Sequence, residues 1–188
     1  MTTLTSSNDL PDALSYLGTD AELKKAIKSI HPINYTSDNV PFLQREGALA
    51  VHELATDYAR SGTLHNKNLL ALVLVRLHDL QVRDFAMGIT SEANIETLWS
   101  LWRSVLVIAP AHFVAPVATL FSATSYEKGD MKLAAYALDQ ALEDDSKYPM
   151  AKLLRRVYAA GWPQASFRQM REELHPKVCA SLGVASES

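Results

Sequence analysis

The six histidines have the widest chemical range in this chain, because imidazole binds metals and exchanges protons near neutral pH. His52-Glu53 begins like the helical zinc-protease motif, in which a second histidine follows four residues after the first. Thr56 occupies that position here, so the second metal ligand is missing. No two histidines recur at the spacing of a ligand pair on one helix. We therefore predict no metal site and no cofactor.

Catalytic chemistry has one weak candidate, the cluster of His78, Asp79 and Arg83. An ion pair or a capping contact within a helix explains these residues equally well. Cys179 has no basic neighbour and no helix start beside it, so nothing in the sequence indicates an activated thiol. The chain also lacks a nucleophile elbow and a phosphate-binding loop. We predict that the protein is not an enzyme, and an enzyme whose site is assembled from distant residues stays an alternative.

Charge is distributed unevenly in the C-terminal third of the chain. Residues 127–146 contain six acids and two bases, a net charge of −4, whereas residues 147–177 contain seven bases and two acids, a net charge of +5. One interpretation is complementarity between packed helices. The other is a basic face beside an aromatic side chain that binds an acidic partner or a nucleic-acid backbone. The candidate partner-binding residues are Lys152, Arg155, Arg156, Trp162, Arg168 and Arg171.

Length and composition indicate one globular domain. The chain has 188 residues, of which 48% are hydrophobic and 21% charged, and its net charge is −3. This balance excludes a disordered tail protein and argues against a chain-wide coating of nucleic acid. Neither a secretory signal nor a membrane-spanning run is present, and the single cysteine favours a reducing compartment. We predict a cytoplasmic protein with a flexible leader over residues 1–19, a helical domain over 20–178 and a flexible tail over 179–188.

Hydrophobic spacing predicts helices that position these candidates. Apolar residues recur at helical intervals, and no segment alternates over a strand length. Asp20 and Asn66 are expected to cap two of the helices, and the helix that starts at Asn66 is expected to continue to Gly88. The last helix is expected to end near Leu174, because Pro176 follows. The prediction is an all-α single domain of about seven to nine helices in antiparallel pairs.

Residues 129–145 have the spacing of the second helix of a tetratricopeptide repeat. Gly129 lies where the first helix ends, Ala134 where the two helices touch, and Ala141-Leu142 where the next unit packs. The preceding helix, expected over residues 113–127, contains Pro116 and lacks the large aromatic residue and the glycine of the repeat at their usual positions. We predict one tetratricopeptide-like hairpin in the C-terminal half, and an ordinary bundle is the alternative.

A longer segment, residues 115–163, resembles the C-terminal helical region of an actinobacterial family, domain of unknown function 4192. The similar positions are Pro116, Gly129-Asp130, Ala141-Leu142, Leu153-Leu154, and Gly161 with Pro163, and upstream Val82-Arg83-Asp84. The resemblance implies the fold and the lineage, and it implies no activity. The α/β half of that family has no counterpart in this sequence, so we expect a free-standing helical version.

These observations together favour a non-catalytic helical module that binds a protein or peptide. The expected mechanism is capture of a partner segment in a groove between stacked helices, with Arg155, Arg156 and Trp162 in contact. A nucleic-acid-associated accessory protein that uses the basic face is the alternative. Self-association through Trp99 and Trp102 is a further one, although burial in a core explains these two residues equally well.

Overall fold

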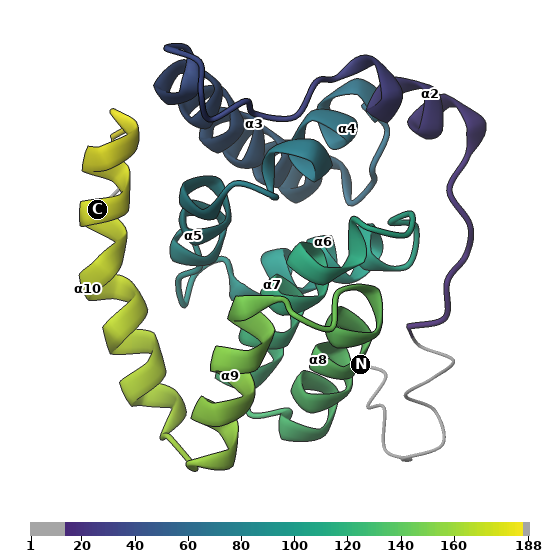
Figure 1. Cartoon of the computed structure of the whole chain (residues 1–188). Helices are drawn as coiled ribbons and strands as arrows, with labels where there is room; N and C mark the ends of the chain where they lie inside the picture. Colours follow the sequence, from purple (N-terminus) through teal and green to yellow (C-terminus); the bar gives the residue numbers. More distant parts are fainter. Residues whose placement is uncertain (1–13, 186–188) are drawn as a thin grey trace.

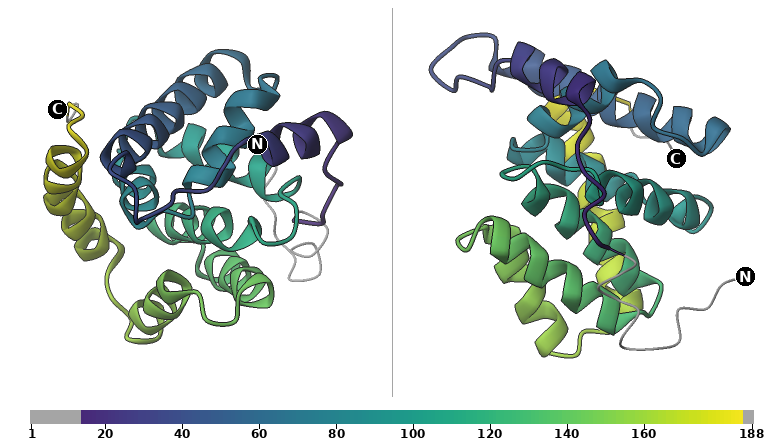
Figure 2. Two further views of the ribbon diagram at one scale, coloured as in Figure 1. Left: turned by 45° about the horizontal axis from the view of Figure 1, so that its top comes forward. Right: turned by 90° about the vertical axis from the view of Figure 1, so that its right-hand side faces the viewer.

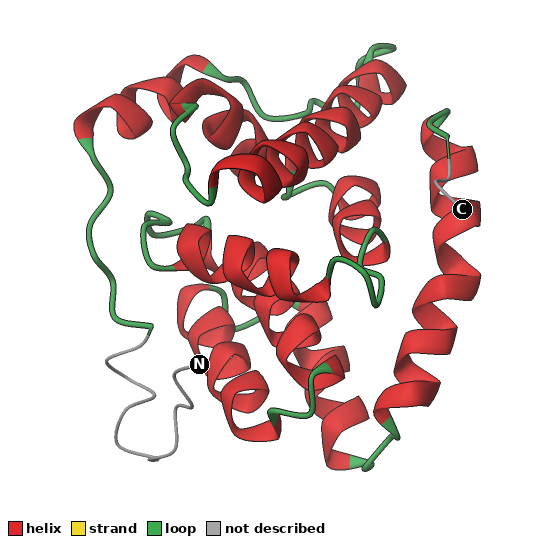
Figure 3. Cartoon of the chain, turned by 180° about the vertical axis from the view of Figure 1, so that it is seen from behind, coloured by secondary structure: helices red, strands yellow, loops and turns green. Residues whose placement is uncertain are grey.

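The computed structural model describes residues 14–185, and within them it contains nine α-helices and no strand (Figures 1 and 3). The predicted all-helical, single-domain fold is therefore confirmed. No helix in this range is long and apolar enough to cross a membrane. The helices are α2 (Ala21–Ser29), α3 (Val40–Ser61), α4 (Lys67–Arg76), α5 (Leu80–Gly88), α6 (Ile95–Leu106), α7 (Val114–Glu127), α8 (Met131–Asp144), α9 (Pro149–Ala159) and α10 (Gln164–Leu182).

Side-chain caps fix the starts of several helices. As predicted, Asp20 and Asn66 accept hydrogen bonds from the third backbone N–H group after them, at 2.7 and 3.0 Å. Asp130 does the same for α8 at 3.0 Å. Each cap satisfies an N–H group that has no partner within its own helix.

The single helix expected from Asn66 to Gly88 is two helices, and this prediction was wrong. α4 ends at Arg76, and α5 begins at Leu80. The Asp79 carboxylate accepts hydrogen bonds from the backbone N–H groups of Gln81 and Val82, at 2.8 and 3.2 Å. In a continuous helix these N–H groups would bond carbonyls one turn earlier, so the Asp79 cap replaces the helical bonds and starts a new helix.

The last helix continues past its expected end near Leu174. α10 includes Pro176 and ends at Leu182, where Gly183 adopts a left-handed conformation. A proline inside a helix costs about 3 kcal/mol. Burial of Cys179 and Leu182 beyond it offsets that cost. Together with the buried Leu14, these residues show that packing extends into the described parts of both the expected leader and the expected tail. Residues 1–13 and 186–188 lie outside the described range.

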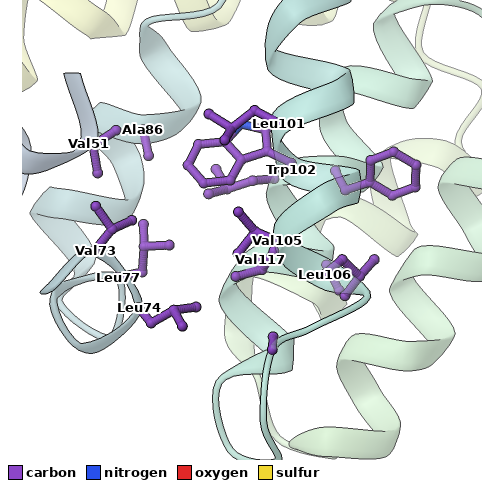
Figure 4. Close-up of a cluster of buried hydrophobic side chains, with 14 of the residues drawn as sticks. Val51, Val73, Leu74, Leu77, Ala86, Leu101, Trp102, Val105, Leu106 and Val117 are labelled. Carbon is purple, nitrogen blue, oxygen red and sulfur yellow. The ribbon is translucent and has the colours of Figure 1, made fainter. Parts of the chain in front are cut away.

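The core is built around α7, whose side chains are buried from Ala115 to Glu127. α7 packs most extensively against α8 as a hairpin and also against α6. Buried side chains from α3, α4, α5, α6 and α7 meet in one cluster (Figure 4). Trp102 is fully buried in it, and Trp99 donates a hydrogen bond to the Ser125 hydroxyl at 3.0 Å. The tryptophan stripe therefore packs within the domain and does not form an exposed surface for self-association.

α10 lies along one side of the molecule (Figures 1 and 2). It starts next to α9 and contacts α7, α5 and α3 in turn. Helices far apart in the sequence are thereby joined by one segment, and the turn between α9 and α10 lies at the opposite end of the molecule from α3.

Candidate interaction surface on helix α9

Helix α9 has one buried face and one solvent face. Ala151 and Leu154 are buried where α9 packs against α7 and α8. Lys152 and Arg156, one helical turn apart, lie on the exposed side. Leu153 lies beside them on the helix and is 53% exposed.

Two of the predicted basic residues form ion pairs with acids outside their own helices. Arg155 pairs with Asp139 of α8 at the surface. Arg168 pairs with Glu92, and its Nε lies 3.5 Å from Glu127 Oε2. Part of the charge asymmetry is therefore complementarity between packed helices, one of the two interpretations left open by the sequence.

Arg171 does not belong to an exposed basic face, so that prediction is corrected. Its side chain is buried and binds the Glu127 carboxylate with two nitrogens, at 2.7 and 3.0 Å. It also donates hydrogen bonds to the carbonyls of Gly88, at 3.2 Å, and Thr90. Arg171 lies on the side of α10 that faces α5 and α7. A buried arginine requires an acidic partner, which Glu127 supplies here.

Trp162 lies in the turn after α9, and its backbone is held in place. The Tyr126 hydroxyl donates a hydrogen bond to the Trp162 carbonyl. The Tyr126 ring stacks on Tyr158 with ring centroids 4.1 Å apart. Burial raises the pKa of Tyr158 well above its usual range, and Phe167 is also buried. These three aromatics lie in the core or pack against it, whereas the Trp162 side chain is 41% exposed.

Within residues 14–185, neither Lys152 nor Arg156 forms an ion pair. The predicted set thus divides into a buried residue, Arg171, and two paired ones, Arg155 and Arg168, while Lys152 and Arg156 are exposed on α9 and Trp162 is exposed in the turn that follows it. Leu153 was not among the predicted residues. Ala151 and Leu154 lie on the apolar stripe of α9, and Leu153 lies off that stripe. This position in the helical pattern indicates that Leu153 is exposed.

The side chains of His78, Asp79 and Arg83, the catalytic candidates, each contact different partners. Asp79 caps α5 and accepts hydrogen bonds from Tyr35 and Gln44, each at 2.9 Å. Arg83 pairs with Asp84 at 2.6 Å. His78 packs edge-on against Phe113 with ring centroids 5.1 Å apart. Burial and the Asp79 carboxylate raise the pKa of Tyr35 to about 12, so its hydroxyl stays a hydrogen-bond donor.

Cys179 and His175 lie one turn apart on α10, with Sγ and Nε2 3.4 Å apart. Burial raises the pKa of the Cys179 thiol, which disfavours the nucleophilic thiolate. Burial, and the nearby charge of Arg171, lower the pKa of His175. The pair is therefore a neutral packing contact. Across residues 14–185 no group of three or more histidine, cysteine or acidic side chains is arranged to hold a metal ion.

Comparison with known proteins gives one match. A family model described as "Domain of unknown function (DUF4192)" matches residues 11–165. The match covers most of the chain, and it begins far upstream of residues 115–163, the segment that carries the resemblance in the sequence. No curated protein and no solved structure matches the chain.

Proposed function

The chain belongs to the DUF4192 family, and from that premise we propose that it is a non-catalytic helical module that binds an acidic segment of a partner protein. The binding site is the α9 surface, defined as Lys152, Leu153, Arg156 and Trp162. The family description names no activity, so the support comes from this chain alone. The observation that carries the proposal is the pair of unpaired cations on the solvent face of α9, with Leu153 exposed on the same helix and Trp162 exposed in the turn that follows it.

The chemistry of the α9 surface favours a protein ligand. Lys152 and Arg156 attract carboxylates, and Leu153 and Trp162 offer apolar area that water solvates poorly. Arginine and tryptophan are enriched at the energetically important centres of protein interfaces. A nucleic-acid backbone would need a longer row of cations, but Arg155, Arg168 and Arg171 are already engaged with acids of this chain.

The hairpin of α7 and α8 supports the tetratricopeptide-like part of the proposal. Gly129 makes the turn with a φ of 84°, a left-handed conformation that suits glycine. The Ser122 hydroxyl donates a hydrogen bond to the Ala134 carbonyl at 2.7 Å, so the helices approach closely at the predicted small residue. In this proposal α9 stacks on the hairpin as part of the next unit and presents the α9 surface. The buried, protonated thiol of Cys179 is compatible with a reducing cytoplasm.

Affinity capture tests the proposal. The tagged full chain is incubated with nuclease-treated and untreated lysates of its native host, and bound proteins are identified by mass spectrometry. The test variant is K152E/R156E. The matched control is K24E/K25E, which makes the same charge change on the exposed side of α2. Circular dichroism verifies that both variants fold.

We expect captured proteins that survive nuclease treatment, remain with K24E/K25E and are lost with K152E/R156E. Partners that disappear with nuclease would overturn the proposal in favour of the nucleic-acid alternative. Retention of every partner by K152E/R156E, or a capture without specific proteins, would also overturn it.

A further inference from the structure

Helices α3 and α4 lie at the other end of the molecule from α9 (Figure 1), and their side chains line a second exposed apolar surface. Phe42 and Leu49 of α3 are 67% and 51% exposed. With Ala50, Leu69 and Leu72 they line a groove of about 450 Å³. Large apolar side chains exposed in a row along one helix are typical of a surface that binds a partner.

The charges along this groove have a regular arrangement. Glu46 is paired with Arg76 at 3.0 Å, so it serves the fold. Arg45 and Glu53 line the same groove and form no ion pair within residues 14–185. Arg45 precedes Leu49 by four residues, and Glu53 follows it by four. Both charges are therefore about 6 Å along the helix axis from Leu49, on opposite sides of it. We define the α3 face as Phe42, Arg45, Leu49 and Glu53.

This arrangement is complementary to itself under a two-fold rotation. If two α3 helices pack antiparallel with the axis at Leu49, Arg45 of each copy faces Glu53 of the other, and the two Leu49 side chains meet. A closed two-fold interface uses the same patch on both copies in this reciprocal way. A parallel arrangement in register would instead oppose like charges. From this symmetry we propose that the α3 face binds a second copy of this chain and forms an antiparallel homodimer.

Phe42 has a defined place in the dimer. It lies seven residues before Leu49, about 10 Å along the axis, so it projects toward the C-terminal half of the other copy's α3. α4 begins beside that half, because a loop of residues 62–66 joins the two helices. Leu69, near the start of α4, lines the groove there. Each Phe42 thus fills the Leu69 end of the groove in the other copy.

Charge exchange tests the dimer. The molar mass of the full chain is measured by light scattering and by sedimentation equilibrium over a concentration series. The variants are R45E, E53R and R45E/E53R, and K132E on the exposed side of α8 is the control. R45E and E53R each place like charges opposite one another twice per dimer, so we expect each to raise the dimer dissociation constant by about tenfold or more.

Two further results are specific to the antiparallel arrangement. R45E/E53R restores the opposite-charge contacts and is expected to dimerise like the wild type. An equimolar mixture of R45E and E53R is expected to form a heterodimer, because every contact between the two variants is attractive. A wild type that is monomeric at all concentrations, unchanged dimerisation of R45E, or a mixture that stays monomeric would each overturn the proposal. The α9 surface lies at the opposite end, so K152E/R156E is expected to leave the dimer intact, which separates this test from that of the proposed function.

Discussion

At the scale of single residues, the arginines divide into those that hold helices together and those that face solvent. Arg171 joins α10 to Glu127 of α7, and Arg76 joins α4 to Glu46 of α3 and to the carbonyl of His31 at 2.8 Å. The acid that binds Arg171 lies 44 positions away in the sequence. The sequence pattern predicts six residues for an interaction surface. It does not distinguish Arg171 from Arg156, because local spacing contains no information about partners that are distant in the sequence.

Replacement of Arg171 by alanine is expected to destabilise the fold strongly. It would leave the Glu127 carboxylate buried, with only the Arg168 Nε at 3.5 Å. Loss of one member of a buried ion pair typically costs about 3 to 5 kcal/mol. Urea denaturation measures the change in the free energy of unfolding. R171M/E127M removes both charges and is expected to be more stable than R171A, and an R171A variant as stable as the wild type would contradict this role.

The lowered pKa of His175 predicts how the free energy of unfolding depends on pH. Burial and Arg171 lower its pKa in the folded protein, whereas the unfolded chain takes up the proton near its ordinary value of about 6.5. Between these two pKa values the unfolded state binds more protons. The contribution of His175 is therefore complete above about pH 6.5 and is lost as the pH falls toward the folded-state pKa.

Urea denaturation between about pH 5 and 8 checks this effect. H175Q is expected to show a shallower decrease in the free energy of unfolding on acidification than the wild type. The control H65Q replaces an exposed histidine. Identical pH profiles for H175Q and the wild type would exclude His175 as the source of the slope.

At the scale of helices, α5 and α10 are in unusually close contact at Gly88. A Cβ atom built on Gly88 would lie 2.1 Å from His175 Nδ1 and 2.7 Å from its Cγ. Only a residue without a side chain fits beneath the imidazole ring, so Gly88 sets the distance between the two helices. No sequence pattern indicates this role, because a glycine at position 88 is read only as the end of a helix.

The G88A substitution is expected to destabilise the protein by about 1 to 3 kcal/mol, the usual range for overpacking. H175A removes the ring that the new methyl group would meet. The double variant G88A/H175A is therefore expected to lose less stability than the sum of the two single variants, as measured by thermal or urea unfolding. Strict additivity would show that the steric conflict is not with His175.

The helices themselves follow from local signals in most places. Asp20 and Asn66 are caps in the sequence and in the structure, because a cap contacts only its own helix. The break at Asp79 was missed because apolar residues continue across it, so the periodicity fits one helix or two. The continuation of α10 through Pro176 was missed because it depends on Cys179 and Leu182, whose burial against other helices no local rule predicts.

At the scale of the whole molecule, the two proposed surfaces lie at opposite ends and have different chemistry. The α3 face combines both signs of charge in a self-complementary order, and the α9 surface presents only cations with apolar side chains. An antiparallel dimer through α3 would hold two α9 surfaces facing away from each other. A partner with two acidic segments would then bind with increased avidity. The charge asymmetry in the sequence predicts the α9 region as an interaction surface. The α3 face is not predictable from the sequence, because it depends on which apolar residues are left exposed by the folded core.

Peptide display most directly tests the central claim that the α9 surface recognises an acidic segment. A library of random peptides is selected on the immobilised full chain, and the enriched peptides are titrated against the wild type, K24E/K25E and K152E/R156E. We expect enriched peptides that combine acidic with apolar residues, bind the wild type and K24E/K25E equally, and bind K152E/R156E at least about tenfold more weakly. Enriched peptides without acidic residues, or equal binding by K152E/R156E, would contradict the claim.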